Sequence, residues 1–170
     1  MEKLIGDFID TIAKENSILD SLNDYAQEKQ HLIILGKVEE LDSLIKKEGI
    51  VISNLDKIEG ARFKLQGQLA SKWGMGLKDC NASEMLAKVK AGYSGLYRQF
   101  EEVIGRLDYN MVRLKALNTH NNELINQSLD YISLMESMLS GDVAGTYSQK
   151  GLQVDERDAR PRLNLLDRKI

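Results

Sequence analysis

The chain has 170 residues, of which 42% are hydrophobic, 6% aromatic and 29% charged, and its formal net charge is −3. This length suits one domain or one extended unit, and the near balance of charge excludes a general basic field that would attract nucleic acid. The single proline is Pro161, so residues 1–160 can form long uninterrupted helices, which disfavours an all-β or α/β fold.

Two apolar stripes with steps of three and four residues predict helices over about residues 2–35 and 38–73. Gly36 separates the two helices, and the segment Trp73–Gly76 ends the second. Because the break at Gly36 is short, the helices are expected to form an antiparallel hairpin. The stripes contain Ile5, Phe8, Ile12, Glu15, Leu19, Leu22, Ala26, Lys29 and Ile33, then Leu41, Leu44, Glu48, Val51, Leu55, Ile58, Arg62, Leu65 and Leu69.

A third stripe predicts one continuous helix over about residues 83–139. Ser83, followed by Glu84, is the predicted N-cap, and Ser140–Gly141 is the predicted stop. At ~1.5 Å per residue this helix is a rod of roughly 85 Å, so roughly 30 Å of it should lack cover from the other two. The stripe contains Leu86, Val89, Tyr93, Leu96, Phe100, Val103, Leu107, Asn110, Leu114, Leu117, Asn121, Leu124, Ser128, Tyr131, Met135 and Met138.

Together these patterns predict an all-α fold, an elongated antiparallel three-helix bundle or helical hairpin coiled coil, over residues 1–140. Polar residues interrupt the stripes, and they either fix the register of helix pairing or line a groove. These residues are Glu15, Lys29, Glu48, Arg62, Asn110 and Asn121. Gly92 and Gly95 mark either a close helix crossing, which we favour, or a hinge.

Residues 141–170 form a predicted tail, in which glycine, serine and charge increase and the apolar stripe stops. The tail has six basic and five acidic residues, whereas residues 1–140 have seventeen and twenty-one. Burying its larger aliphatic side chains yields about 9–18 kcal/mol, less than the roughly 19–38 kcal/mol needed to order the backbone of residues 152–170. We therefore expect a disordered, flexible tail that folds on binding, with an unimportant terminus as the alternative.

No combination of residues predicts catalysis, a cofactor or a metal site. Glu28-x-x-His31 has the spacing of di-iron helix bundles, but the second histidine, His120, precedes Glu123 in the reversed order. Cys80 is the only cysteine, so no intrachain disulfide can form, and a buried thiol is expected. These residues favour a protein that is not an enzyme.

The sequence also predicts a cytoplasmic location without membrane insertion. The first residues lack the basic start and apolar core of a signal peptide. The longest apolar run is Leu32–Leu35, far shorter than the ~18 residues that span a bilayer.

Residues 15–62 resemble the repeated leucine, glutamate and turn pattern of FlgN-type flagellar export chaperones. The positions that carry this resemblance are Glu15, Leu19, Leu22, Glu28, Lys29, Leu32, Leu35, Gly36, Val38, Leu41, Leu44, Lys47, Leu55, Glu59 and Arg62. The segment Thr146–Gly151 is similar to the Tyr-x-x-x-Gly that follows the last helix in many members. Chain length and helix order match as well, so the resemblance covers most of the chain.

This resemblance implies a type III secretion chaperone that binds the C-terminal helical segments of hook-associated (hook-filament junction) proteins. Such a chaperone prevents premature assembly and delivers its cargo to the flagellar export apparatus; a weak homodimer is compatible with this role. The predicted partner-binding residues are Leu124, Tyr131, Met135, Met138, Tyr147, Leu163, Leu165, Leu166 and Ile170. Met135 and Met138 could instead be bundle core, and the alternative for the whole chain is a structural coiled-coil protein that forms homo-oligomers or a scaffold.

Overall fold

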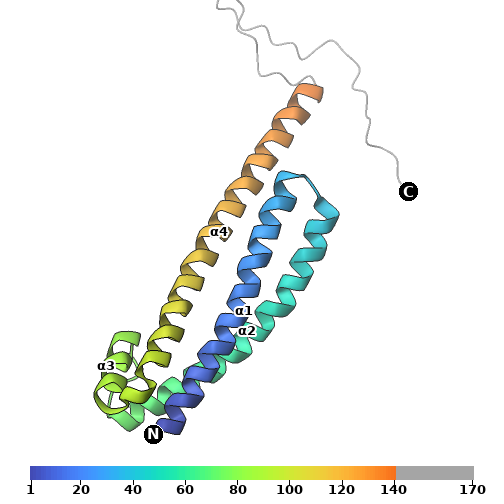
Figure 1. The fold of residues 1–170 in the computed structure, drawn as a ribbon. Coiled ribbons are helices and arrows are strands. Elements are labelled where there is room, and N and C mark those ends of the chain that lie inside the picture. The colour runs from blue at the N-terminus through green and yellow to red at the C-terminus, as the bar shows by residue number, and fades with distance from the viewer. Residues whose placement is uncertain (141–170) are drawn as a thin grey trace, which may run out of the picture. The chain divides into compact units, whose positions relative to one another are not determined.

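The computed structural model describes residues 1–140, which form four helices and no strands (Figure 1). The helices are α1 (Glu2–Ile34), α2 (Val38–Trp73), α3 (Ala82–Gly92) and α4 (Ser94–Ser140). The all-α prediction is therefore confirmed for these residues, and the predicted tail, 141–170, lies outside them. The chain has two compact units: one is Met1–Ser128, and the other begins at Leu129, where its described part, 129–140, is the end of α4.

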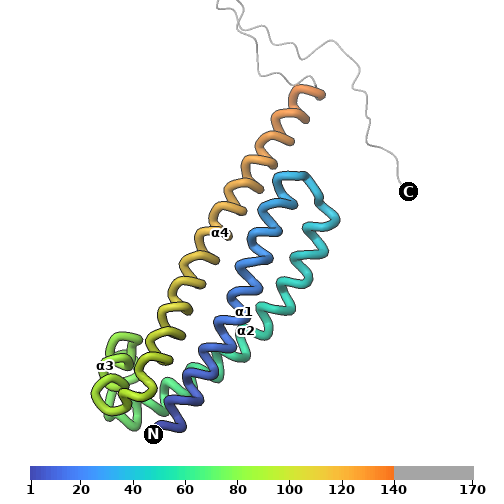
Figure 2. Tube along the Cα trace, viewed as in Figure 1, coloured from blue at the N-terminus to red at the C-terminus, as the bar shows by residue number. Residues whose placement is uncertain are grey.

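The helices α1 and α2 lie side by side as an antiparallel hairpin, which can be followed along the chain trace in Figure 2. Gly36 has a φ of +65°, a left-handed conformation that glycine adopts without steric cost. Its N–H donates to the Ile33 carbonyl at 3.1 Å, and the Lys37 N–H donates to the Leu32 carbonyl at 3.0 Å. These bonds satisfy two carbonyls in the last turn of α1, so the chain reverses directly after the helix.

A loop between α2 and α3 reverses the chain a second time. Gly74 ends α2 in the left-handed region with a φ of +64°. Asn81 begins α3, because its side-chain oxygen accepts a hydrogen bond from the Glu84 N–H at 3.0 Å. The prediction of Ser83 as the N-cap is therefore wrong by two residues, since an asparagine amide oxygen performs the same capping role.

The prediction of one continuous helix over about residues 83–139 is also wrong. The chain leaves helical geometry at Tyr93 (φ −141°, ψ 50°), so the described residues contain four helices where three were expected. An added Cβ on Gly92 or Gly95 would meet no neighbouring atom within 4 Å, which contradicts the close-crossing interpretation. These two glycines instead bracket the break, where glycine weakens helix formation by about 1 kcal/mol relative to alanine.

Burial of α3 explains why the helix breaks. Met85 and Val89 lie one turn apart and are almost fully buried. Val89 belongs to the predicted stripe, but Met85 does not, and Leu86, which does, is half-buried. The two buried residues join a core in which the rings of Phe8 and Phe100 stack with centroids 5.7 Å apart. The core cluster consists of Ile5, Phe8, Ile9, Ile12, Leu69, Ala70, Cys80, Met85, Val89 and Phe100. A straight continuation into α4 would separate α3 from this cluster and forfeit its hydrophobic burial.

Candidate partner-binding surface

The end of α4 carries a dense group of exposed apolar side chains. Their exposed fractions range from 39% for Met135 to 84% for Leu139. We call this group the C-terminal apolar surface, and it consists of Leu129, Tyr131, Ile132, Leu134, Met135, Met138 and Leu139. Soluble proteins rarely expose so many large apolar side chains in one short segment unless that segment binds a partner.

The predicted site residues fall into three groups. Tyr131, Met135 and Met138 belong to the C-terminal apolar surface and are exposed, so they are not bundle core in the described part of the chain. Leu124 is half-buried within the first unit. The remaining predicted residues lie outside the described residues; they are Tyr147, Leu163, Leu165, Leu166 and Ile170.

Sequence reasoning missed four members of this surface. Leu129, Ile132, Leu134 and Leu139 lie off the single stripe of three- and four-residue steps. The available signal was the composition of residues 129–140, which contain two charged residues, Asp130 and Glu136. A helix that is apolar over most of its circumference needs cover on several sides, and this feature is independent of any one stripe.

Two ion pairs join α1 to α2, and all four residues were predicted as interruptions of the apolar stripes. The Lys29 ammonium lies 2.6 Å from the Glu48 carboxylate, and the Arg62 Nε lies 3.0 Å from the Glu15 Oε2. On each helix the two charged positions are two heptads apart, as antiparallel pairing requires. These contacts support the interpretation that the residues fix the helix register.

The Glu15 carboxyl has the most informative electrostatic environment. Burial raises its pKa above the ordinary value of 4.5, and the nearby Arg62 guanidinium only partly opposes this shift. Glu59, whose carboxylate lies 3.4 Å from Arg62, raises the pKa of Glu15 further. The ion pair is therefore held in place at an electrostatic cost, which suits a determinant of register better than a source of stability.

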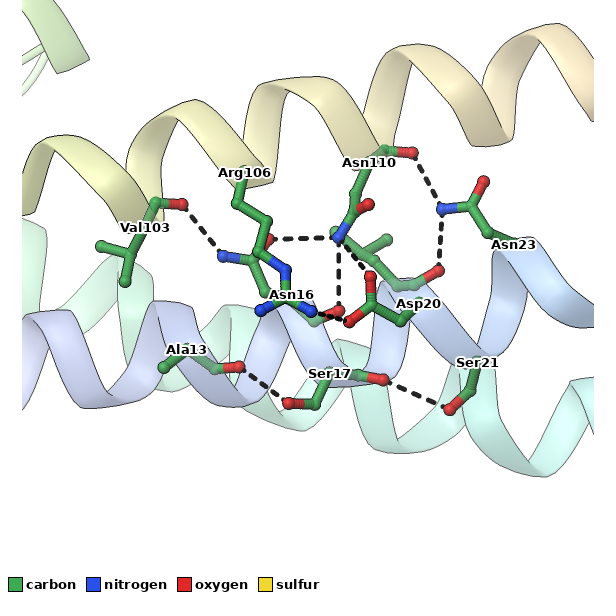
Figure 3. Close-up of polar contacts among 10 residues, drawn as sticks. Ala13, Asn16, Ser17, Asp20, Ser21, Asn23, Val103, Arg106 and Asn110 are labelled. Atoms are coloured by element: carbon green, nitrogen blue, oxygen red, sulfur yellow. Dashed lines mark hydrogen bonds and ion pairs between the residues drawn. The ribbon is translucent and has the colours of Figure 1, made fainter.

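Asparagine side chains join α1 to α4 (Figure 3). The Asn16 amide donates to the Val103 carbonyl at 2.9 Å, and the Asn23 amide donates to the Asn110 carbonyl at 3.2 Å. Asn110 in turn donates to Asp20 at 2.9 Å. Each of these contacts requires a specific alignment of the two helices, because a buried amide left without partners costs about 1–3 kcal/mol.

A further asparagine contact lies farther along the same helices. The Asn121 amide donates to the Ala26 carbonyl at 2.8 Å, and Asn121 is almost fully buried. Contacts on α4 thus advance from Val103 to Asn121 as those on α1 advance from Asn16 to Ala26, so these helices run parallel. Asn110 and Asn121, which interrupt the predicted third stripe, therefore align α4 on α1.

The residues first considered for metal or thiol chemistry do not form a metal site within residues 1–140. Glu28 and His31 are exposed near the end of α1, while His120 and Glu123 are exposed on α4 with Nδ1 and Oε2 3.8 Å apart. Within residues 1–140, no three His, Cys, Asp or Glu side chains gather as metal ligands would. Burial raises the pKa of the Cys80 thiol above its ordinary value, so the thiol form is favoured over the nucleophilic thiolate.

No helix within residues 1–140 has the length and hydropathy needed to cross a membrane.

Similarity to known proteins is found at the level of a protein family. No curated protein and no solved structure matches the chain. The family model described as FlgN protein does match, over residues 1–154. This match covers most of the sequence, so the chain belongs to the FlgN family, whose members are flagellar export chaperones rather than enzymes.

Proposed function

We propose that this protein is a cytoplasmic chaperone that binds the C-terminal helical segments of hook-associated proteins, prevents their premature assembly and delivers them to the flagellar export apparatus. The observation that carries the proposal is the C-terminal apolar surface, in a chain of the FlgN family. Helical segments that assemble into a filament must expose apolar residues before assembly. A chaperone that covers those residues with apolar residues of its own removes the driving force for self-association.

The composition of this surface suits such cargo. Met135 and Met138 have flexible, polarisable side chains that adapt to more than one apolar partner. Asp130 and Glu136 are the charged residues of segment 129–140, so its acidic side chains favour a cargo helix with basic residues at its rim. Each large apolar side chain fully removed from water contributes about 1.5–3 kcal/mol, and several together suffice for reversible binding.

The tail adds a second element to the proposal. Its predicted contact residues are Tyr147, Leu163, Leu165, Leu166 and Ile170. The aliphatic residues among them lie at positions 163–170, and four arginines lie among or near these positions, namely Arg157, Arg160, Arg162 and Arg168. A segment of this composition gains enough burial to become ordered only when a partner supplies additional apolar area.

The proposal is tested by introducing charge into the C-terminal apolar surface. Lysine at Met135 or Met138 should weaken binding of a hook-associated protein segment at least about tenfold, since a buried unpaired ammonium is strongly unfavourable. Ile50→Lys, on an exposed α2 position, is the matched control and should change binding little. Titration calorimetry measures the affinity, and circular dichroism measures the melting temperature of each variant.

Three results would count against the proposal. Binding that is unaffected by lysine at both methionines would remove this surface from cargo recognition. A large fall in melting temperature for these variants, but not for Ile50→Lys, would show that the methionines are core residues of the assembled protein. A stable tetramer or fibre by mass measurement would favour the structural coiled-coil alternative.

A further inference from the structure

A separate apolar groove lies within the first unit, residues 1–128. It contains a cavity of about 190 Å³ that all four helices line. Phe8 and Ile12 of α1 contribute buried apolar surface, and Met111 of α4 lines the cavity while remaining 56% exposed. Cavities of roughly 150 Å³ can hold a benzene ring, so this one can hold a large apolar side chain.

The helix α3 contacts both this cavity and the hydrophobic core. Ala82 and Met85, in the first turn of α3, form part of the cavity lining. From there α3 inserts Met85 and Val89, one turn apart, into the core formed with the other helices. Met85 therefore belongs both to the core and to the cavity lining, so a side chain that enters the cavity would contact the apolar interior.

Two large apolar side chains are exposed at or beside the cavity. Phe63 is 54% exposed and follows Arg62, which lines the cavity, while Gln66, one helical turn later, lines it as well. Residues three apart share a helix face, so Phe63 and Gln66 lie next to one another on α2. Met111 on α4 therefore lines the cavity with a large exposed apolar side chain, and Phe63 on α2 is exposed beside the lining residue Gln66.

Charge near the groove favours a basic occupant. Arg62 already contacts the carboxylates of Glu15 at 3.0 Å and Glu59 at 3.4 Å. Asp108 also lines the cavity, and it has no ion pair or hydrogen bond within the described part of the chain. Two carboxylates already pair with Arg62, whereas Asp108 has no cation partner among the described residues, so a lysine or arginine from an occupant would find its counter-charge there.

We propose that this groove is a second docking site, which binds an amphipathic helical segment of the cargo with a large apolar side chain in the cavity and a lysine or arginine next to Asp108. The identity of the partner rests on the proposed chaperone function. The groove itself is independent of the C-terminal apolar surface, because all of its residues lie within 1–128.

Methionine methyl groups make the two surfaces distinguishable in one experiment. The full chain is labelled with ¹³C at its methionine methyls and titrated with a synthetic peptide of the C-terminal helical segments of a hook-associated protein. Met85 and Met111 report on the groove, Met135 and Met138 report on the C-terminal apolar surface, and Met1 serves as a reference. We expect the Met85 and Met111 resonances to shift and saturate with the peptide.

A charge exchange tests the predicted ion pair. Asp108→Lys should weaken peptide binding about fivefold, and a peptide whose basic residue is changed to glutamate should regain that affinity with this variant. Asp24→Lys, an exposed position on α1, is the matched control and should show neither effect.

The outcomes separate this inference from the proposed function. If no peptide binds the wild-type chain, the proposed function fails. If the peptide binds and shifts Met135 and Met138 but neither Met85 nor Met111, the groove proposal alone is overturned. Two other occupants would also overturn it. Shifts of Met111 that depend on chain concentration without peptide would indicate a second copy, and shifts caused by deleting residues 141–170 would indicate the tail.

Discussion

Glu15 and Arg62 illustrate how single residues determine the pairing of α1 with α2. Their side chains are largely removed from water, and each would be left without its counter-charge if the other were lost. We predict that Arg62→Met lowers the free energy of unfolding by about 2–3 kcal/mol, because it leaves the Glu15 carboxyl buried without its cation. Urea unfolding followed by circular dichroism measures the change.

The double variant Glu15→Leu with Arg62→Leu is the control. It removes both charges together, so its free energy of unfolding should lie within about 1 kcal/mol of the wild type. If Arg62→Met has the same stability as the wild type, the ion pair contributes nothing and the helix register depends on the other contacts.

The raised pKa of Glu15 leads to a prediction about pH. As the pH falls from neutrality toward 4.5, the folded chain takes up a proton at Glu15 before the unfolded chain does, so protonation stabilises the fold. The free energy of unfolding of the wild type minus that of Glu15→Gln should therefore increase over this range. Urea unfolding of both proteins at a series of pH values measures the difference, and a constant or decreasing difference would contradict the raised pKa.

At the scale of elements, the break at Tyr93 determines which residues of α3 are core. Met85 is buried and Leu86 is half-buried, whereas a continuous helix following the predicted stripe would bury Leu86. We predict that Met85→Ala costs about 2–4 kcal/mol and Leu86→Ala distinctly less, because the alanine at position 85 leaves a larger cavity. Thermal and urea unfolding of the two variants give the comparison, and a larger loss at Leu86 would support the continuous helix.

Periodicity alone could not reveal this break. Leu86, Val89, Tyr93 and Leu96 continue a regular stripe across the break, so the local pattern is the same for a straight helix and for two helices. Gly92 and Gly95 were visible as weak points, but their effect depended on what α3 could bury elsewhere. That burial involves Phe100 and Leu69, which lie in other helices.

At the scale of the whole molecule, the ten residues of the buried core cluster all lie between Ile5 and Phe100. We therefore predict that deleting residues 141–170 leaves helicity and melting temperature largely intact while weakening cargo binding. Circular dichroism and calorimetry with the same peptide measure the two effects. A chain in which the order of residues 152–170 is scrambled is the matched control, since it keeps length and composition.

Each outcome of the deletion has a clear consequence. Unchanged cargo binding would remove the tail from the mechanism, and so would a scrambled tail that binds as well as the native one. A large loss of melting temperature would mean that the tail is part of the folded structure, because such a loss requires the removal of buried contacts.

The sequence by itself determined the helical class, the hairpin turn at Gly36 and the polar positions that interrupt each stripe. These features depend on neighbouring residues: helical periodicity, the lack of proline and the conformational freedom of glycine act within a few positions of the chain. Only the tertiary structure decided that Glu15 pairs with Arg62, that Asn110 contacts Asp20 and that α3 separates from α4 at Tyr93. Those outcomes depend on which buried surfaces and polar partners distant segments offer each other, and local spacing does not contain that information.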